Sequence, residues 1–134
     1  MPIGDDIFWF METGTGFGAS SECGFFIADG MGKYANVKKA NMRRSRGRPA
    51  LINMKSKVIF ACGGFMNRTA EKYDIEKDQW RLIAPLHYPR EGCYGVAIDD
   101  SIYVFTGYDT AKDKFRNSVE VLNTSLLGQF GGDW

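Results

Sequence analysis

The sequence holds little of what most metal and catalytic sites need. Among its 134 residues there is one histidine, His87, so a histidine-based metal site or catalytic pair has no second imidazole to draw on. The three cysteines, Cys23, Cys62 and Cys93, are odd in number and lack CxxC spacing, which excludes a closed disulfide framework. We expect them to be reduced, mostly buried thiols in a cytoplasmic protein.

An excess of one charge and a long apolar run are also missing. The formal net charge is only +1, which argues against a protein that coats nucleic acid or a membrane surface. No apolar stretch approaches the length of a membrane span. The first residues, MPIGDDIFWFMETG, carry acidic side chains where a secretory signal would be basic. The sequence therefore predicts no membrane partner, and it predicts no cofactor.

No segment shows a sustained helical period, whereas residues typical of strands and turns are abundant. Aromatic residues make up 14% of the chain, and there are 16 glycines. This mixture favours short strands joined by glycine-rich turns, with helix minor at most. Since 44% of the residues are apolar, the chain can build a substantial core.

Part of the sequence repeats. Residues 46–65, RGRPALINMKSKVIFACGGF, align without a gap over residues 90–109, REGCYGVAIDDSIYVFTGYD, each position 44 residues on. In this alignment Val58 meets Ile102 and Gly63 meets Gly107, so the third copy has Gly107 followed by tyrosine in place of two glycines. Four strand-like runs bounded by turn residues, PALIN, KVIFAC, AEKYDI and QWRLIAPL, make up the complete middle copy.

The similarity continues downstream. Each copy reaches an x-E-x-[YL]-[DN] segment, AEKYD at 70–74 and VEVLN at 119–123, and then a tryptophan, Trp80 or Trp134. A weaker copy precedes these two, and in it Tyr34 is expected to stand where Trp80 stands.

A repeat of roughly 45–50 residues with four strands, a glycine pair, a tyrosine and a tryptophan resembles the kelch repeat. The resemblance implies an all-β fold: a partial kelch-type β-propeller of four-stranded antiparallel blades, a fragment of or an arc within a larger ring. The expected division of the single 1–134 segment is a degenerate partial blade at about 5–45, a complete blade at 46–89 and a partial blade at 90–134. The chain is expected to start at a blade's second strand, and to need further blades from the full-length protein or another chain.

The same resemblance implies roles for the residues that define the repeat. The glycine pair Gly63 and Gly64 would end the second strand, where missing side chains let the backbone turn and neighbours approach. Tyr73 and Trp80 would pack between sheets. These residues are predicted to be scaffold.

Candidate partner-binding residues lie on a basic run, KKANMRRSRGR, at 38–48. Its arginines Arg44, Arg46 and Arg48 could contact an acidic protein segment, the run could be a solvated loop between blades, and nucleic acid is the least favoured ligand. In some kelch-like propellers an arginine at the position of Arg46 and its counterpart Arg90 faces the mouth of the ring and pairs with acidic peptides. Alternatively, each braces its neighbouring turns.

The sequence therefore favours a non-enzymatic protein-interaction module or scaffold, serving as a substrate adaptor, a cytoskeletal protein or a subunit of a large assembly. A pair of Cys93 with His87 lacks a third group to orient it. The alternative is part of a kelch-type propeller enzyme whose catalytic residues lie outside this chain. No catalytic, cofactor or metal residue is assigned.

Overall fold

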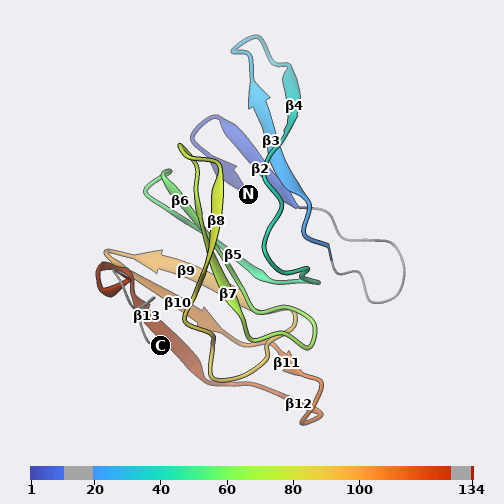
Figure 1. Cartoon of the computed structure of the whole chain (residues 1–134), viewed down its shortest axis with the longest axis vertical. Coiled ribbons are helices and arrows are strands. Elements are labelled where there is room, and N and C mark those ends of the chain that lie inside the picture. The colour runs from blue at the N-terminus through green and yellow to red at the C-terminus, as the bar shows by residue number, and fades with distance from the viewer. Residues whose placement is uncertain (11–19, 128–133) are drawn as a thin grey trace.

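Strands dominate the computed structural model, which describes residues 1–10, 20–127 and 134. The described residues form thirteen strands and one short 3-10 helix, Thr124–Leu126, but no α-helix, so the all-β prediction is confirmed. Most strands belong to three antiparallel sheets, which follow one another along the molecule and are named blades 1, 2 and 3 in chain order (Figure 1).

Blade 1 is a four-stranded sheet in the order β1-β2-β3-β4. The expectation that the chain starts at a second strand was wrong, because a two-residue first strand pairs with β2. Gly4, with φ of +60°, lies in the tight turn that joins them. The strands are β1 (Pro2–Ile3), β2 (Asp6–Phe10), β3 (Cys23–Ala28) and β4 (Tyr34–Lys38).

Blade 2 has the four strands that the middle repeat predicted, in the order β5-β6-β7-β8. Its second strand is a continuous apolar run, VIFAC, as expected for a strand with both faces covered. The strands are β5 (Ala50–Met54), β6 (Val58–Cys62), β7 (Ala70–Asp74) and β8 (Gln79–Ile83).

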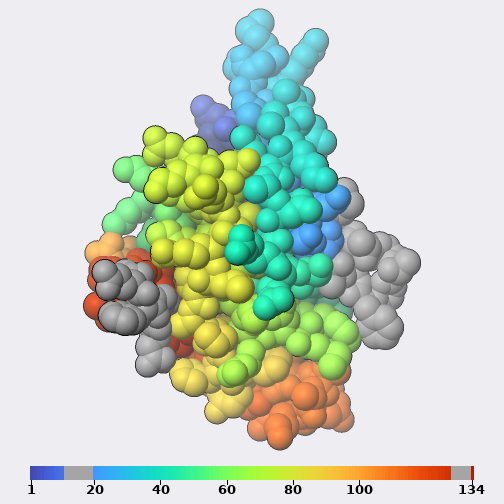
Figure 2. All heavy atoms as spheres, in the orientation of Figure 1, coloured from blue at the N-terminus to red at the C-terminus, as the bar shows by residue number. Residues whose placement is uncertain are grey.

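Blade 3 has three paired strands among the described residues, in the order β13-β10-β9. A small hairpin, β11-β12, is inserted between its second and third strands and projects at one end of the molecule (Figures 1 and 2). The strands are β9 (Tyr94–Ile98), β10 (Ser101–Phe105), β11 (Tyr108–Asp109), β12 (Lys114–Phe115) and β13 (Val119–Asn123).

Blade 2 lies between the other two blades, and the core has two parts. On β6, Ile59 and Ala61 pack into a cluster shared with blade 1, whereas Phe60 and Cys62 pack into a cluster shared with blade 3. Successive side chains of a strand point to opposite faces, so one strand serves both clusters. Face-to-face packing of neighbouring sheets is thus the main source of the buried apolar area.

The ungapped alignment of the second and third repeats was wrong by one residue beyond the first hairpin. The turn between β5 and β6 has three residues, because Met54 pairs with Val58, whereas the turn between β9 and β10 has two, because Ile98 pairs with Ser101. The strands that follow these turns, β6 and β10, are therefore offset by 43 residues and not by 44. Alternation alone could not detect this shift, because β6 is apolar on both faces.

This shift changes which residues replace the glycine pair in blade 3. Gly63 and Gly64 have φ of +71° and +122°, and Thr106 and Gly107 have φ of +61° and +98°. A Cβ on Gly64 would lie 3.4 Å from the Arg46 Cβ, and a Cβ on Gly107 would lie 2.9 Å from the Arg90 Cβ. Thr106 and Gly107 thus stand in for the pair.

The glycine pair is needed for both reasons that the sequence suggested. Both glycines have left-handed backbone, which disfavours larger residues. A Cβ on Gly63 would lie 2.8 Å from the Arg90 carbonyl oxygen, and one on Gly64 would lie 3.0 Å from that of Gly47. The pair therefore allows loops of two blades to approach closely.

The tryptophans hold neighbouring blades together. Trp80 is 6% exposed, stacks on buried Tyr73 with ring centroids 4.8 Å apart, and donates its Nε1 hydrogen to the Ala40 carbonyl oxygen at 3.0 Å. Trp134 donates in the same way to the Ala84 carbonyl oxygen at 2.6 Å. The two acceptors are 44 residues apart, so Trp134 is the counterpart of Trp80, and the predicted inter-sheet role is confirmed for Tyr73 and Trp80.

The equivalent place in blade 1 is not occupied by Tyr34, contrary to the expectation. Trp80 lies opposite Tyr73 across β7 and β8, and the corresponding pair in β3 and β4 is Phe26 with Asn36. Tyr34 lies two residues earlier and is 53% exposed. Blade 1 therefore lacks the tryptophan of the repeat, and an Asn36 side chain instead accepts a hydrogen bond from Trp9.

Candidate protein-interaction surface

The Arg46 side chain is fully buried, although it belongs to the basic run. Its guanidinium donates to Glu71 Oε2 from Nη2 at 2.9 Å and from Nε at 3.3 Å. It also donates to the carbonyl oxygens of Gly63 and Thr69 at 2.8 and 2.7 Å, and to Thr69 Oγ1 at 3.0 Å. These acceptors satisfy the forked donor group, which a buried ion pair requires.

Glu71 completes the brace on its other side. Its carboxylate accepts hydrogen bonds from the backbone N–H groups of Arg43 and Arg44, the latter at 3.1 Å. The pair of Arg46 and Glu71 therefore ties the loop between β4 and β5 to the third strand of blade 2. A single buried carboxylate thus contacts three residues of a loop that is rich in positive charge.

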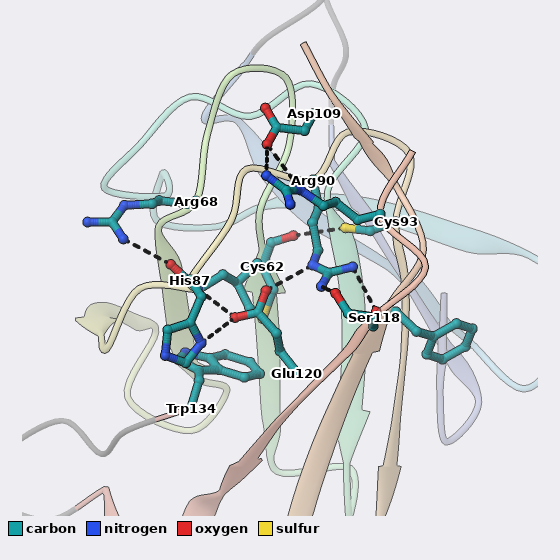
Figure 3. A network of polar contacts seen from close by, with 12 residues as sticks. Cys62, Arg68, His87, Arg90, Cys93, Asp109, Ser118, Glu120 and Trp134 are labelled. Atoms are coloured by element: carbon teal, nitrogen blue, oxygen red, sulfur yellow. Dashed lines mark hydrogen bonds and ion pairs between the residues drawn. The ribbon is translucent and has the colours of Figure 1, made fainter. Parts of the chain in front are cut away.

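Blade 3 repeats this brace with Arg90 and Glu120, as Figure 3 shows. Nε of Arg90 donates to Glu120 Oε2 at 2.9 Å, and its Nη atoms reach the Thr106 carbonyl at 2.7 Å and the Ser118 carbonyl and hydroxyl oxygens at 3.0 and 2.7 Å. His87 Nδ1 lies 3.0 Å from Glu120 Oε1. Arg90, like Arg46, is fully buried.

Partner binding by Arg46 and Arg90 stays a prediction. Direct contact with a partner would require each side chain to break its present hydrogen bonds. Each guanidinium would have to leave a buried carboxylate and at least two backbone acceptors inside its own blade. The arrangement seen is the alternative that the sequence left open, in which each arginine braces its neighbouring turns. The other two candidates, Arg44 and Arg48, are exposed on the same loop.

Arg48 links the loop before the first strand of blade 2 to the loop before the first strand of blade 3. Its side chain is 67% exposed and forms an ion pair with Glu91, and its carbonyl oxygen accepts the Gly92 N–H at 3.0 Å. These contacts border an open hollow of about 620 Å³. Its lining residues are Arg48, Glu91, Gly92, Tyr94, Thr106, Gly107, Tyr108 and Phe115.

Aromatic side chains form the apolar part of this hollow. Tyr94 is 69% exposed and Phe115 is 78% exposed, at a level unusual for large apolar groups that serve only as core. Tyr108 meets Phe115 edge-on, with ring centroids 5.0 Å apart. The Tyr108 hydroxyl donates to Asp113, and this hydrogen bond raises the pKa of Tyr108.

The β11-β12 hairpin holds two of these aromatic groups in place. Asp109 accepts an ion-paired hydrogen bond from Arg116, which lowers the pKa of Asp109, and the Arg116 Cζ lies 3.8 Å from the centre of the Tyr88 ring. The sequence analysis did not predict this hairpin. The alternation in YDTAKDKF is too short to identify strands of two residues.

The cysteines are free and buried, as predicted. Burial raises the pKa of Cys23 to about 11, and it also raises the pKa values of Cys62 and Cys93. The Cys93 thiol is directed at the Cys62 carbonyl oxygen at 3.6 Å, whereas His87 faces Glu120, so the two do not form a catalytic pair. Within the part of the chain that the structure describes, no group of three metal-ligating side chains gathers.

The described residues include no helix long and apolar enough to cross a bilayer.

Comparison with known proteins identifies the repeat. A family model described as the Kelch motif matches residues 57–87. F-box/kelch-repeat protein SKIP20 of Arabidopsis thaliana is 31% identical over 113 residues, which cover 72% of this chain and 25% of that protein. Kelch repeat-containing protein kel-10 of Caenorhabditis elegans is 37% identical over 81 residues, covering 58% and 13%. Kelch repeat and BTB domain-containing protein 2 of Homo sapiens is 35% identical over 74 residues, covering 51% and 12%.

Three stacked antiparallel blades, of which blades 2 and 3 are each braced by a buried arginine and glutamate, define this molecule as an arc of propeller-type blades. With the sequence matches, they place it more narrowly: the chain belongs to the kelch-repeat family. It spans about a quarter or less of the length of these relatives.

Proposed function

We propose that the chain is a non-enzymatic protein-interaction module that binds an extended, acidic segment of a partner at the hollow between blades 2 and 3. The observation that carries the proposal is the grouping of exposed Tyr94 and Phe115 with the Arg48 loop around one hollow. Aromatic groups supply apolar contact area, and arginine supplies paired donors for carboxylates.

In this proposal the four candidate arginines divide into two kinds. Arg44 and Arg48, both exposed, make the contacts with the partner, and Arg44 extends the positive surface along the loop. Arg46 and Arg90 act indirectly, because they hold the loops that present the binding groups. A direct grip on the peptide by Arg46 and Arg90 is the competing version.

The names of the relatives support an interaction role. Several combine kelch repeats with an F-box or a BTB domain. We infer that this chain serves as the partner-recognition part of a larger adaptor or assembly. The proposal assigns it no catalytic step. Three free, buried thiols favour work in the reducing cytoplasm.

An array of extended peptides that differ only in net charge tests the proposal. The wild-type chain is expected to retain acidic peptides with an apolar anchor, and the Arg44→Glu/Arg48→Glu variant is expected to lose about tenfold or more in affinity, since two attractive contacts become repulsive. Phe115→Ala should weaken the same peptides. Lys33→Glu, a charge reversal at the exposed β3-β4 turn, is the matched control.

Two results would count against this assignment. Retention that does not depend on peptide charge would remove the acidic segment from the proposal. Equal binding by the wild type and the Arg44→Glu/Arg48→Glu variant, with loss in a folded Arg90→Lys variant, would favour the competing version.

A further inference from the structure

Glu91 is an acidic residue in the wall of the hollow for which an acidic ligand is proposed above. Its carboxylate forms an ion pair with Arg48, and the Glu91 side chain is 12% exposed whereas that of Arg48 is 67% exposed. Arg48 is also the arginine that the proposed function brings to a partner's carboxylate. In the free chain this arginine therefore already has a carboxylate beside it.

The inserted hairpin fixes the backbone of Glu91. The Glu91 N–H donates to the Tyr108 carbonyl oxygen at 3.0 Å, and the Glu91 carbonyl oxygen accepts the Tyr108 N–H at 2.8 Å. The preceding residue, Arg90, is the fully buried arginine of the blade 3 brace. The carboxylate is thus presented from a fixed position, and the more exposed Arg48 side chain is the partner that can turn toward a ligand.

Blade 2 shows that the frame of a blade does not need a carboxylate at this position. The residue that corresponds to Glu91 in the repeat is Gly47. Its carbonyl oxygen accepts the Phe65 N–H at 2.8 Å, as the Glu91 carbonyl oxygen accepts that of Tyr108. The backbone bond is therefore common to both blades, whereas the carboxylate belongs to blade 3.

The ion pair is not needed to join the two blades either. Backbone bonds already connect their loops, because the Gly92 N–H donates to the Arg48 carbonyl oxygen at 3.0 Å and the Gly64 N–H donates to that of Arg90 at 2.8 Å. An ion pair with one largely exposed partner adds little to stability. The Glu91 carboxylate is thus better explained by what it does to the hollow.

We propose that Glu91 is an internal competitor for Arg48, so that an acidic partner has to displace this carboxylate before Arg48 can bind it. The inference rests on the function proposed above and adds the residue that restrains it. Glu91 opposes an acidic segment in two ways, because it occupies the arginine and because its charge repels the carboxylates of the segment. A neutral segment that contacts only the aromatic groups of the hollow meets neither obstacle.

This competition sets how much negative charge a partner must carry. A segment with a single carboxylate only exchanges one ion pair of Arg48 for another and leaves Glu91 unpaired. A segment with several carboxylates keeps a net attraction to Arg44 and Arg48 after Glu91 has been displaced. The hollow therefore rejects weakly charged segments and accepts strongly acidic ones.

Glu91→Gln tests the proposal, because it removes the charge and keeps the size of the side chain. The probes are three synthetic extended peptides that share one aromatic anchor and carry several glutamates, a single glutamate, or glutamines only. By fluorescence anisotropy at low salt, Glu91→Gln is expected to bind both glutamate peptides about fivefold more tightly than the wild type does, with the glutamine peptide unchanged. The gain should shrink as salt is added, because exposed charges are screened.

Asp100→Asn is the matched control. Asp100 pairs with Lys55 at 2.7 Å in another exposed ion pair between blades 2 and 3, and neither residue lines the hollow. The control changes the net charge by the same amount as Glu91→Gln, so it should leave the three affinities unchanged. An equal gain from Asp100→Asn would overturn the proposal, since the effect would then come from net charge alone.

Arg48→Gln shows whether Glu91 acts through Arg48. In this background Glu91→Gln should give a clearly smaller gain than in the wild type, because no arginine is left to be released. An equal gain in both backgrounds would mean that Glu91 acts by repulsion alone, and it would overturn the competition for Arg48.

The remaining outcomes separate this inference from the proposed function, with a thermal melt showing that each variant is folded. Suppose that the wild type prefers the most acidic peptide and that Arg44→Glu/Arg48→Glu abolishes the preference. Equal or weaker binding of that peptide by Glu91→Gln would then overturn the competitor alone. Tighter binding of the glutamine peptide as well would indicate a loosened loop and would also overturn it. If neither the wild type nor Glu91→Gln binds any of the peptides, the peptide site and the competitor both fail.

Discussion

Three positions on the first strand of a blade are covered in blade 2 and exposed in blade 3. They are Ala50, Ile52 and Met54 on β5 and Tyr94, Val96 and Ile98 on β9, and the two strands have the same length and the same place in their blades. Ile52 is 2% exposed and its counterpart Val96 is 42% exposed. Both residues are β-branched and apolar, so side-chain chemistry does not explain the difference. Burial in this fold is a property of the neighbouring blade. A residue with a core composition can thus lie at the surface of an arc.

The interior of the two blades differs far less than their faces. Each has a buried arginine before its first strand, a buried glutamate on its third strand and a pair of left-handed residues after its second strand. These features serve the blade itself, whereas the faces serve its neighbours.

Removing either brace should be costly, and equally so in both blades. Arg46→Ala and Arg90→Ala each leave a buried glutamate without its cation, so each should lower the free energy of unfolding by about 3–5 kcal/mol. Chemical denaturation measures the change. A cost below about 1 kcal/mol for one of them would show that the two braces are not equivalent.

Trp80→Ala should cost about 3–5 kcal/mol, because it opens a cavity at the contact between blades 1 and 2 and removes a hydrogen bond across it. The matched change is Tyr34→Ala, because the repeat suggested Tyr34 as the blade 1 equivalent of Trp80. Tyr34 is exposed, so this change should cost less than about 1 kcal/mol. Similar costs for the two variants would contradict the strand pairing that separates them.

The covered and exposed faces can be compared directly by truncation. Ile52→Ala should cost about 2–5 kcal/mol, whereas Val96→Ala should cost less than about 1 kcal/mol in a monomeric chain. Both changes are best compared in dilute protein, where association between chains does not contribute to the measured stability. Equal costs would mean that the face of blade 3 is covered from within the chain.

The smallest effect concerns the residues after the second strand. Thr106→Gly should raise the free energy of unfolding by up to about 1 kcal/mol. Left-handed backbone costs residues other than glycine about 1–2 kcal/mol, and part of this gain is lost because glycine makes the unfolded chain more flexible. Gly63→Thr should be destabilising, since its Cβ would lie 2.8 Å from a carbonyl oxygen. A destabilised Thr106→Gly variant would contradict the assigned equivalence.

Sequence reasoning predicted the repeat, the strands of blade 2 and the packing of Tyr73 and Trp80, because each leaves a local pattern of apolar residues, glycines or aromatics. It missed the one-residue shift of β10, since a strand that is apolar on both faces does not reveal its register. It could not place Arg46, because a buried arginine and a loop arginine look alike until Glu71, 25 residues away, is brought beside it. The hollow was missed for the same reason, because its residues come from four separate stretches of the sequence.

Thiol labelling of Val96→Cys and Ile52→Cys, compared in dilute protein, tests the central claim most directly. The native cysteines are buried and should react slowly in both variants, which makes them an internal reference. The account predicts that the new thiol at 96 is modified about 100-fold faster than the one at 52, because labelling of a covered side chain needs local opening. Comparable rates at the two positions would contradict the account.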